Sequence, residues 1–163
     1  MQEELKIAII QSHLVWENPL QNRLNFASKL EQITEAVDVI ILPEMFTSGF
    51  TMNAQTAAER MEGETVHWML DMAKQKQTAI VGSLVIEEDN NYYNRLLFVE
   101  PNGKIIQYNK RHGFSLAGED KVYTSGTERV IIEYKGWRIC PQICYDLRFP
   151  VWSRNTDNYD VLL

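Results

Sequence analysis

The chain has few cysteines and few histidines. Cys140 and Cys144 are its two cysteines among 163 residues, and it has three histidines. The C-x-x-x-C spacing of the two cysteines fits neither a redox C-x-x-C pair nor a zinc-binding knuckle. A disulfide across this spacing would have to bend the strand that carries both residues. We therefore expect two free thiols.

An excess of basic residues and a long apolar run are also missing. The chain has 16 Lys and Arg against 22 Asp and Glu, for a net charge of -6. Binding to a phosphate backbone needs clustered Lys and Arg, so this balance argues against a nucleic-acid partner. Glu3 and Glu4 stand where a signal peptide has basic residues, and the apolar run that follows is too short to span a membrane. We expect a cytoplasmic protein with a small-molecule substrate.

No internal repeat, low-complexity tract or linker divides the chain. With 45% hydrophobic and 23% charged residues, residues 1–163 are typical of one globular domain. The sequence stops in "NYDVLL", which resembles the start of a buried strand. We expect the domain to be truncated on its C-terminal side, and a short terminal strand on a sheet edge is the alternative.

Strands alternate with helices in the first half of the chain. Asn18 can cap a helix that has Pro19 at its first position and Leu20, Leu24 and Leu30 on its apolar face. The other expected elements are a strand at 5–11 buried on both faces, a strand at 39–44, a helix at 63–77, a strand at 78–86, and hairpins at 92–110 and 129–144. This pattern predicts an α/β fold with a mixed sheet and helices packed on it.

Three reactive residues stand just beyond the ends of expected strands, namely Glu44, Lys110 and Cys144. If those strands run parallel, the three side chains meet at one sheet edge, where ligands usually bind. A carboxylate can activate a thiol, an ammonium can hold developing negative charge, and a thiol can attack an acyl carbon. The set indicates acyl transfer.

Each of these residues also has a structural explanation. Glu44 could be a solvated loop carboxylate, Lys110 and Arg111 an ordinary basic pair, and the cysteine a packed core thiol. His112 and His13 are alternative bases, which would make a Cys–His pair the rival catalytic design.

Three segments occur in order along the chain: "LPEMF" around Glu44, "YNKRHGF" around Lys110 and "ICYDLRFP" around Cys144. In these segments the chain resembles the nitrilase superfamily of carbon–nitrogen hydrolases, and the resemblance covers essentially its whole length. It implies an α-β-β-α sandwich with a mixed central sheet that continues past this chain, and a homodimer or higher homo-oligomer.

The resemblance also implies roles for individual residues. Cys144 would be the nucleophile, Glu44 the general base, Lys110 the oxyanion stabiliser, Glu119 a second active-site glutamate, and the peptide nitrogen of Tyr145 a further oxyanion donor. No metal or organic cofactor would be required. The lysine is expected to lower the pKa of the thiol.

The runs "CYDLRFPVWSRN" and "KRHGFSLAGE" are most similar to the omega-amidase branch, which hydrolyses terminal amides of small dicarboxylates and 2-oxo acids such as 2-oxoglutaramate. A substrate carboxylate needs a cation, for which Arg148 and Arg111 are candidates, and Phe114 is a candidate pocket residue. Arg148 could instead pair with Asp146. The alternatives are an N-carbamoyl amino acid amidohydrolase, a nitrilase, or an inactive fragment of such an enzyme.

Overall fold

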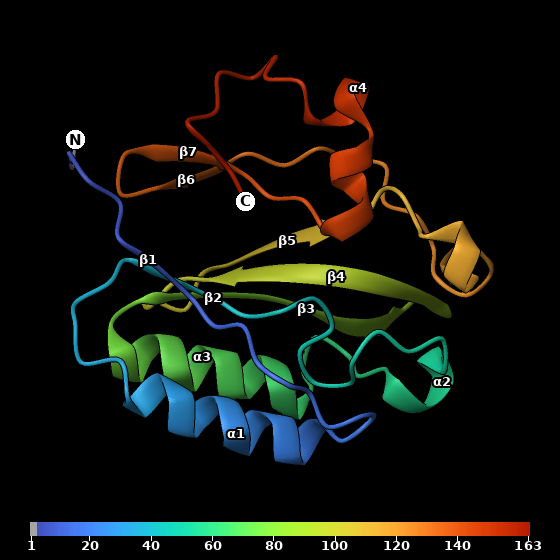
Figure 1. Cartoon of the computed structure of the whole chain (residues 1–163), viewed down its shortest axis with the longest axis horizontal. Coiled ribbons are helices and arrows are strands. Elements are labelled where there is room, and N and C mark those ends of the chain that lie inside the picture. The colour runs from blue at the N-terminus through green and yellow to red at the C-terminus, as the bar shows by residue number, and fades with distance from the viewer. Residues whose placement is uncertain (1–2) are drawn as a thin grey trace.

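The computed structural model describes residues 3–163, which form helices packed on two stacked sheets (Figure 1). The larger sheet contains, in spatial order, β1 (Ile7–Ile9), β2 (Val39–Ile41), β3 (Ala79–Glu88), β4 (Asn91–Val99) and β5 (Ile105–Asn109). β1, β2 and β3 run parallel, β4 runs antiparallel to β3, and β5 antiparallel to β4. The sheet is mixed, as predicted, and β2 and β5 point in the same direction.

The smaller sheet contains β6 (Ile132–Tyr134), β7 (Trp137–Cys140) and β8 (Val161–Leu162). β6 and β7 form an antiparallel hairpin, and β8 runs parallel to β7. Lys135 and Gly136 form the turn with φ of 50° and 88°. Two positive φ values are what a tight hairpin turn requires, and this explains the glycine.

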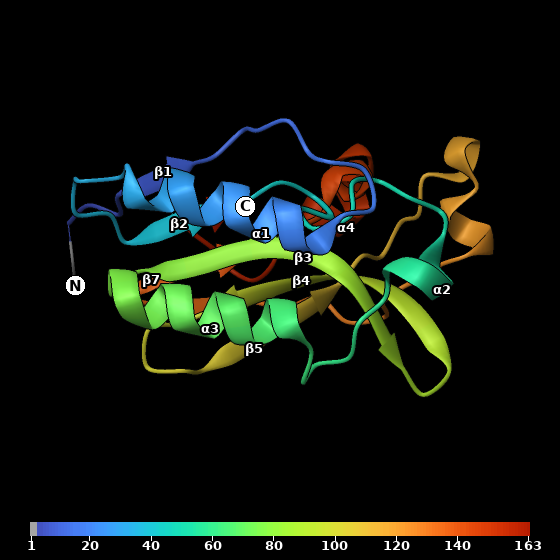
Figure 2. The ribbon, with the colours of Figure 1, turned by 90° about the horizontal axis from the view of Figure 1, so that it is seen from below.

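Two long helices cover one face of the larger sheet, and Figure 2 shows them lying side by side on it. They are α1 (Pro19–Glu31) and α3 (Glu64–Lys76). The short elements are α2 (Ala54–Ala57), α4 (Pro150–Ser153), and the 3₁₀ turns η1 (Ser115–Ala117), η2 (Glu119–Lys121) and η3 (Cys144–Arg148).

The start of α1 is confirmed, whereas its predicted apolar face is wrong in part. Pro19 is the first helical residue, and the Asn18 side chain accepts a hydrogen bond from the Gln21 amide. The buried side chains of the helix are Asn22, Phe26 and Leu30. The leucines at positions 20 and 24 are exposed, because the face toward the sheet is centred on Phe26.

The hydrophobic core lies in two layers, one on each face of the larger sheet. One cluster packs the helices onto the sheet through Phe26, Met69 and Leu97, and the other joins the two sheets through Phe98 and Ile139. Residues 3–163 thus provide an α-β-β arrangement, which is three of the four layers of the expected sandwich. None of the helices described is long and apolar enough to cross a membrane.

Two expectations about strands are wrong. The first strand is not buried on both faces, because the Ile9 side chain of β1 is 76% exposed, and β1 is also an edge strand. The strand expected at 137–144 ends at Cys140. Pro141 follows and lacks the N–H needed to continue the pairing with β6, although the Gln142 amide still donates to the Leu163 carbonyl at 2.7 Å. Cys140 and Cys144 therefore do not share a strand face: the former is buried in the core and the latter is exposed, and both are free thiols.

Candidate active site

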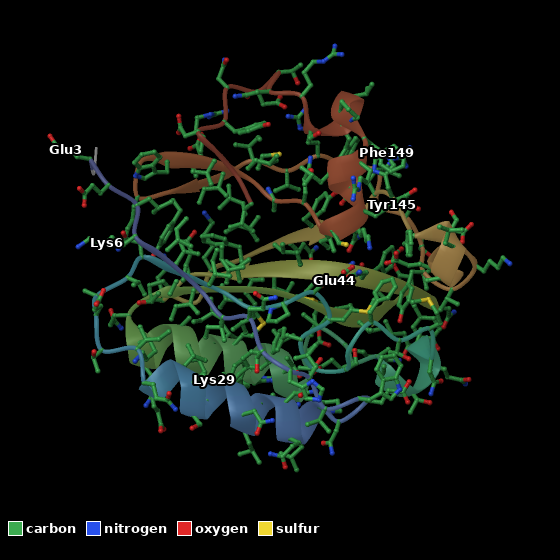
Figure 3. The ribbon with its side chains drawn as sticks, viewed as in Figure 1. Glu3, Lys6, Lys29, Glu44, Tyr145 and Phe149 are labelled. Carbon is green, nitrogen blue, oxygen red and sulfur yellow. The ribbon has the colours of Figure 1, made fainter. Side chains whose placement is uncertain are left out.

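The parallel direction of β2 and β5 brings Glu44 and Lys110 to one edge of the larger sheet. Glu44 follows β2 by three residues and Lys110 follows β5 directly. The Lys110 Nζ lies 2.8 Å from the Glu44 Oε1. In Figure 3, Glu44 lies between the larger sheet and the turn η3, which carries Tyr145. The structure thus brings together two residues that are 66 positions apart in the chain.

A fully buried carboxylate, Glu119, completes this network. Its Oε2 accepts hydrogen bonds from Lys110 Nζ at 2.9 Å and from the Phe114 amide at 2.6 Å. The Asn94 Nδ2 donates to Glu119 Oε1 at 3.1 Å and to Glu44 Oε1 at 2.8 Å. One ammonium and one amide therefore hold both carboxylates in place.

The sequence reasoning did not single out Asn94. It lies on β4 next to Arg95 and the apolar run Leu96–Val99, with its side chain toward the site. A buried polar residue in such a strand needs a hydrogen-bond partner, so an asparagine within "YYNRLLFV" is a usable sequence signal.

The ammonium of Lys110 remains charged in this setting. Burial opposes its charge, but the neighbouring Glu44 and Glu119 outweigh burial and raise its pKa. An ammonium that is charged and held at both sides can stabilise negative charge without reorganising.

Cys144 is the first residue of η3, and its backbone has φ of 43°. This is a sparsely populated conformation for a residue other than glycine, and such strain is frequent at functional sites. Burial raises the pKa of the thiol, as do the charge of Glu44 and a hydrogen bond with it, while Lys110 acts in the opposite direction. Lys110 lowers the pKa of the thiol, as expected, but burial and Glu44 together outweigh the lysine and leave this pKa raised.

A cavity of about 780 Å³ opens among the loops that follow β2 and β5 and the turn η3. Its lining combines the three reactive side chains with aromatic, aliphatic and cationic ones: Glu44, Phe50, Lys110, Phe114, Cys144, Tyr145, Leu147 and Arg148. The peptide N–H of Tyr145 lies in the first turn of η3, where amide groups lack helical partners. Among residues 3–163, no group of three or more His, Cys, Asp or Glu side chains could hold a metal ion.

The structure does not bring Arg111 into this cavity. Its guanidinium donates to the Gly126 carbonyl at 3.1 Å and lies over the Trp152 ring. Arg148 is exposed and lines the cavity. It is the cation among the two candidates that faces the reactive residues.

Neither candidate histidine is placed beside the thiol in the cavity lining. His112 Nδ1 lies 2.8 Å from Asp146 Oδ1, and its ring stacks on Phe149. His13 is exposed in the loop between β1 and α1. Asp146 is buried, and its hydrogen bonds within the described residues go to Tyr108, His112 and Ile143, rather than to Arg148.

The fold and the site together define an α/β sandwich with a glutamate, a lysine and a cysteine gathered at one edge of its larger sheet. The chain belongs to the carbon–nitrogen hydrolase family, whose model matches residues 6–162.

Relatives in this family include named amidases. The chain is 48% identical over 159 residues to the omega-amidase YafV of Escherichia coli strain K12, covering 98% of this chain and 61% of that protein. It is 30% identical over 151 residues to the 2-oxoglutaramate amidase of Bacillus subtilis strain 168, covering 91% and 58%. The chain thus spans about three-fifths of the length of these relatives.

A solved structure has the same fold. XC1258 from Xanthomonas campestris, a CN-hydrolase superfamily protein with an arsenic adduct in its active site, is 43% identical with a TM-score of 0.91, over 94% of this chain and 58% of that one.

Proposed function

We propose that the full-length protein is a thiol-dependent omega-amidase. It hydrolyses the terminal amide of a small 2-oxo or dicarboxylic acid monoamide, such as 2-oxoglutaramate, to the carboxylate and ammonia. The observation that carries this proposal is the cavity in which Glu44, Lys110 and Cys144 meet while Arg148 lines the same space. Identity to YafV of Escherichia coli supports the substrate class.

In the first half of the reaction, the Cys144 sulfur attacks the amide carbon while Glu44 takes the thiol proton. Because Glu44 Oε1 already accepts hydrogen bonds from Lys110 and Asn94, Oε2 is the oxygen that receives the proton. The carbonyl electrons move to oxygen, and Lys110 Nζ and the Tyr145 N–H stabilise the oxyanion. Glu44 then passes the proton to nitrogen, the C–N bond breaks, and ammonia leaves.

In the second half, water resolves the thioester. Glu44, again a carboxylate, removes a proton from water as its oxygen attacks the thioester carbon. The tetrahedral intermediate collapses, the C–S bond breaks, and the sulfur takes the proton from Glu44. A thiol with a raised pKa suits this cycle, because it is neutral until the carboxylate takes its proton during attack.

The substrate carboxylate requires a cation, because burying an unpaired charge is costly. Arg148 is the candidate that lines the cavity. The rings of Phe114 and Tyr145 pack edge to face with 5.1 Å between their centroids. They form a wall for the short carbon chain between the amide and the acid.

The test is ammonia release by the full-length protein from 2-oxoglutaramate, succinamate and a neutral amide of similar size. We expect a much higher kcat/KM for the two anionic amides, and Arg148→Ala should remove that preference more than it lowers turnover of the neutral amide. A wild-type protein that prefers the neutral amide contradicts the omega-amidase assignment. Three other outcomes would each favour a different assignment. Release of carbon dioxide with ammonia from N-carbamoyl amino acids indicates a carbamoyl amidohydrolase, turnover of nitriles indicates a nitrilase, and inactivity on every substrate indicates an inactive protein.

A further inference from the structure

The carboxylate of Asp146 is fully buried and accepts four hydrogen bonds. Its Oδ2 accepts from Tyr108 Oη at 2.6 Å and from the Ile143 amide at 3.1 Å. Its Oδ1 accepts from the His112 amide and contacts the His112 Nδ1, both at 2.8 Å. Because a carboxylate oxygen can only accept, that Nδ1 carries a hydrogen. Both oxygens of the carboxylate are thus satisfied within the protein.

The donors come from the two segments that carry Lys110 and Cys144. Tyr108 and His112 flank the lysine on both sides, and Ile143 directly precedes the cysteine. The lysine segment extends from the larger sheet and the cysteine segment follows the smaller one. One carboxylate therefore joins the two sheets where the reactive residues meet.

The donors are themselves held in place. Trp152 Nε1 donates to Tyr108 Oη at 3.0 Å, and the His112 ring stacks on Phe149 with 3.7 Å between centroids. Burial and the hydrogen bond with Asp146 raise the pKa of Tyr108, so its phenol remains a donor. Charge-assisted bonds from fixed donors offset the cost of burying the charge.

The backbone of Cys144 needs such support. Its φ of 43° is unfavourable for a residue with a side chain and persists only when the surroundings impose it. Asp146 acts on this turn from within, because its own carboxylate binds the Ile143 amide on the other side of the cysteine.

From this geometry we propose that Asp146 is a positioning residue that fixes Cys144 relative to Lys110 without touching the substrate. The proposal rests on the proposed function in so far as Cys144 is the nucleophile. Asp146 does not line the cavity, so it acts through the placement of the reacting groups. Its loss should change kcat more than KM.

The test is Asp146→Asn in the full-length protein, in a Cys140→Ala background so that alkylation reports Cys144. The asparagine side chain keeps the shape of the aspartate but replaces one acceptor oxygen with an NH2 group. That NH2 group then faces an N–H or O–H donor instead of accepting a hydrogen bond from it. We expect kcat to fall about 100-fold, as for a displacement of reacting groups by about 1 Å, with a much smaller change in KM. The rate at which iodoacetamide alkylates Cys144 should fall as well.

Asp38→Asn is the matched control. Asp38 is also buried, accepts from the Lys6 amide and pairs with Lys135, and precedes β2 at the end opposite Glu44. The Asp38→Asn substitution should lower Tm while leaving kcat and the alkylation rate of Cys144 unchanged. A folded Asp146→Asn protein with wild-type kcat and alkylation would overturn the proposal, as would equal losses of both in the control.

If Asp146→Asn does not fold, Tyr108→Phe serves in its place, because it removes one donor and keeps the ring. It should lower kcat and alkylation by a smaller factor, and no change in either would overturn the proposal. Alkylation requires no amide substrate. A protein that hydrolyses no amide but shows the expected alkylation losses would contradict the proposed function and support the positioning role.

Discussion

The two thiols of the chain differ in burial and in neighbours. Cys140 is 1% exposed in the core, whereas Cys144 faces Glu44 and Lys110 in the cavity. We expect Cys144→Ala to abolish ammonia release and Cys140→Ala to retain most of it, because only the former removes the proposed nucleophile. Equal loss in both variants, measured in folded protein, would contradict the assignment.

The pH dependence of Cys144 alkylation follows from the same neighbours. Burial, the charge of Glu44 and its hydrogen bond raise the pKa of the thiol, and Lys110 lowers it. Glu44→Gln removes a negative charge, so the alkylation rate should reach its plateau at lower pH than in the wild type. Lys110→Met removes a positive charge and should move the plateau to higher pH.

The measurement is the rate of iodoacetamide alkylation against pH in a Cys140→Ala background. A plateau that moves to higher pH in Glu44→Gln would show that the carboxylate does not act on this thiol.

At the scale of elements, the end of β5 sets the position of Lys110. The Lys110 amide donates to the backbone carbonyl of Asn94, and the Lys110 carbonyl accepts from the Gly126 amide at 2.8 Å. A Cβ at Gly126 would lie 2.2 Å from the Asn109 carbonyl oxygen, so an alanine there must push the loop away from the strand end. We expect Gly126→Ala to lower kcat about 10- to 100-fold through displacement of the lysine and to destabilise the fold by about 1–3 kcal/mol.

Gly103→Ala is the control, in the turn before the other end of β5. Gly103 has φ of 91° and open space around it, so alanine costs backbone strain of about 1 kcal/mol there without moving Lys110. Urea unfolding should show a loss of stability in both variants, and ammonia release should show a loss of kcat in Gly126→Ala alone. Unchanged kcat in that variant would contradict the role assigned to this contact.

At the scale of the whole molecule, an apolar opening lies between the edges of the two sheets. A cavity of about 320 Å³ is lined by Ile9 of β1 and by Leu162 and Leu163 at and after β8, and both strands are sheet edges. Exposed edges with apolar side chains promote pairing with another chain. We expect a polypeptide of residues 1–163 to associate through this opening.

Light scattering after size exclusion provides the measurement. Ile9→Lys should reduce association, because the side chain is largely exposed and its replacement does not disturb the core. Leu20→Lys should have little effect, because Leu20 is exposed on α1 and does not line the opening. A polypeptide that is monomeric at every concentration would contradict the prediction.

Local features of the fold could be predicted from the sequence. The start of α1 at Asn18 and Pro19 and the hairpin turn at Lys135 and Gly136 depend on neighbouring residues alone. The predicted end of β7 is wrong, because the apolar pattern continues past Cys140 although Pro141 ends the pairing with β6. The order of the three segments indicates which residues are candidates for the chemistry.

By itself, the sequence determined the candidate reactive residues and the strands that Glu44 and Lys110 follow. Only the tertiary structure decided that Asn94 holds two carboxylates, that Asp146 joins two sheets, and that Arg148 rather than Arg111 faces the cavity. The same holds for the pKa of Cys144, which burial and Glu44 raise. The physical reason is that hydrogen bonding, burial and charge act through space, between residues that a linear pattern leaves far apart.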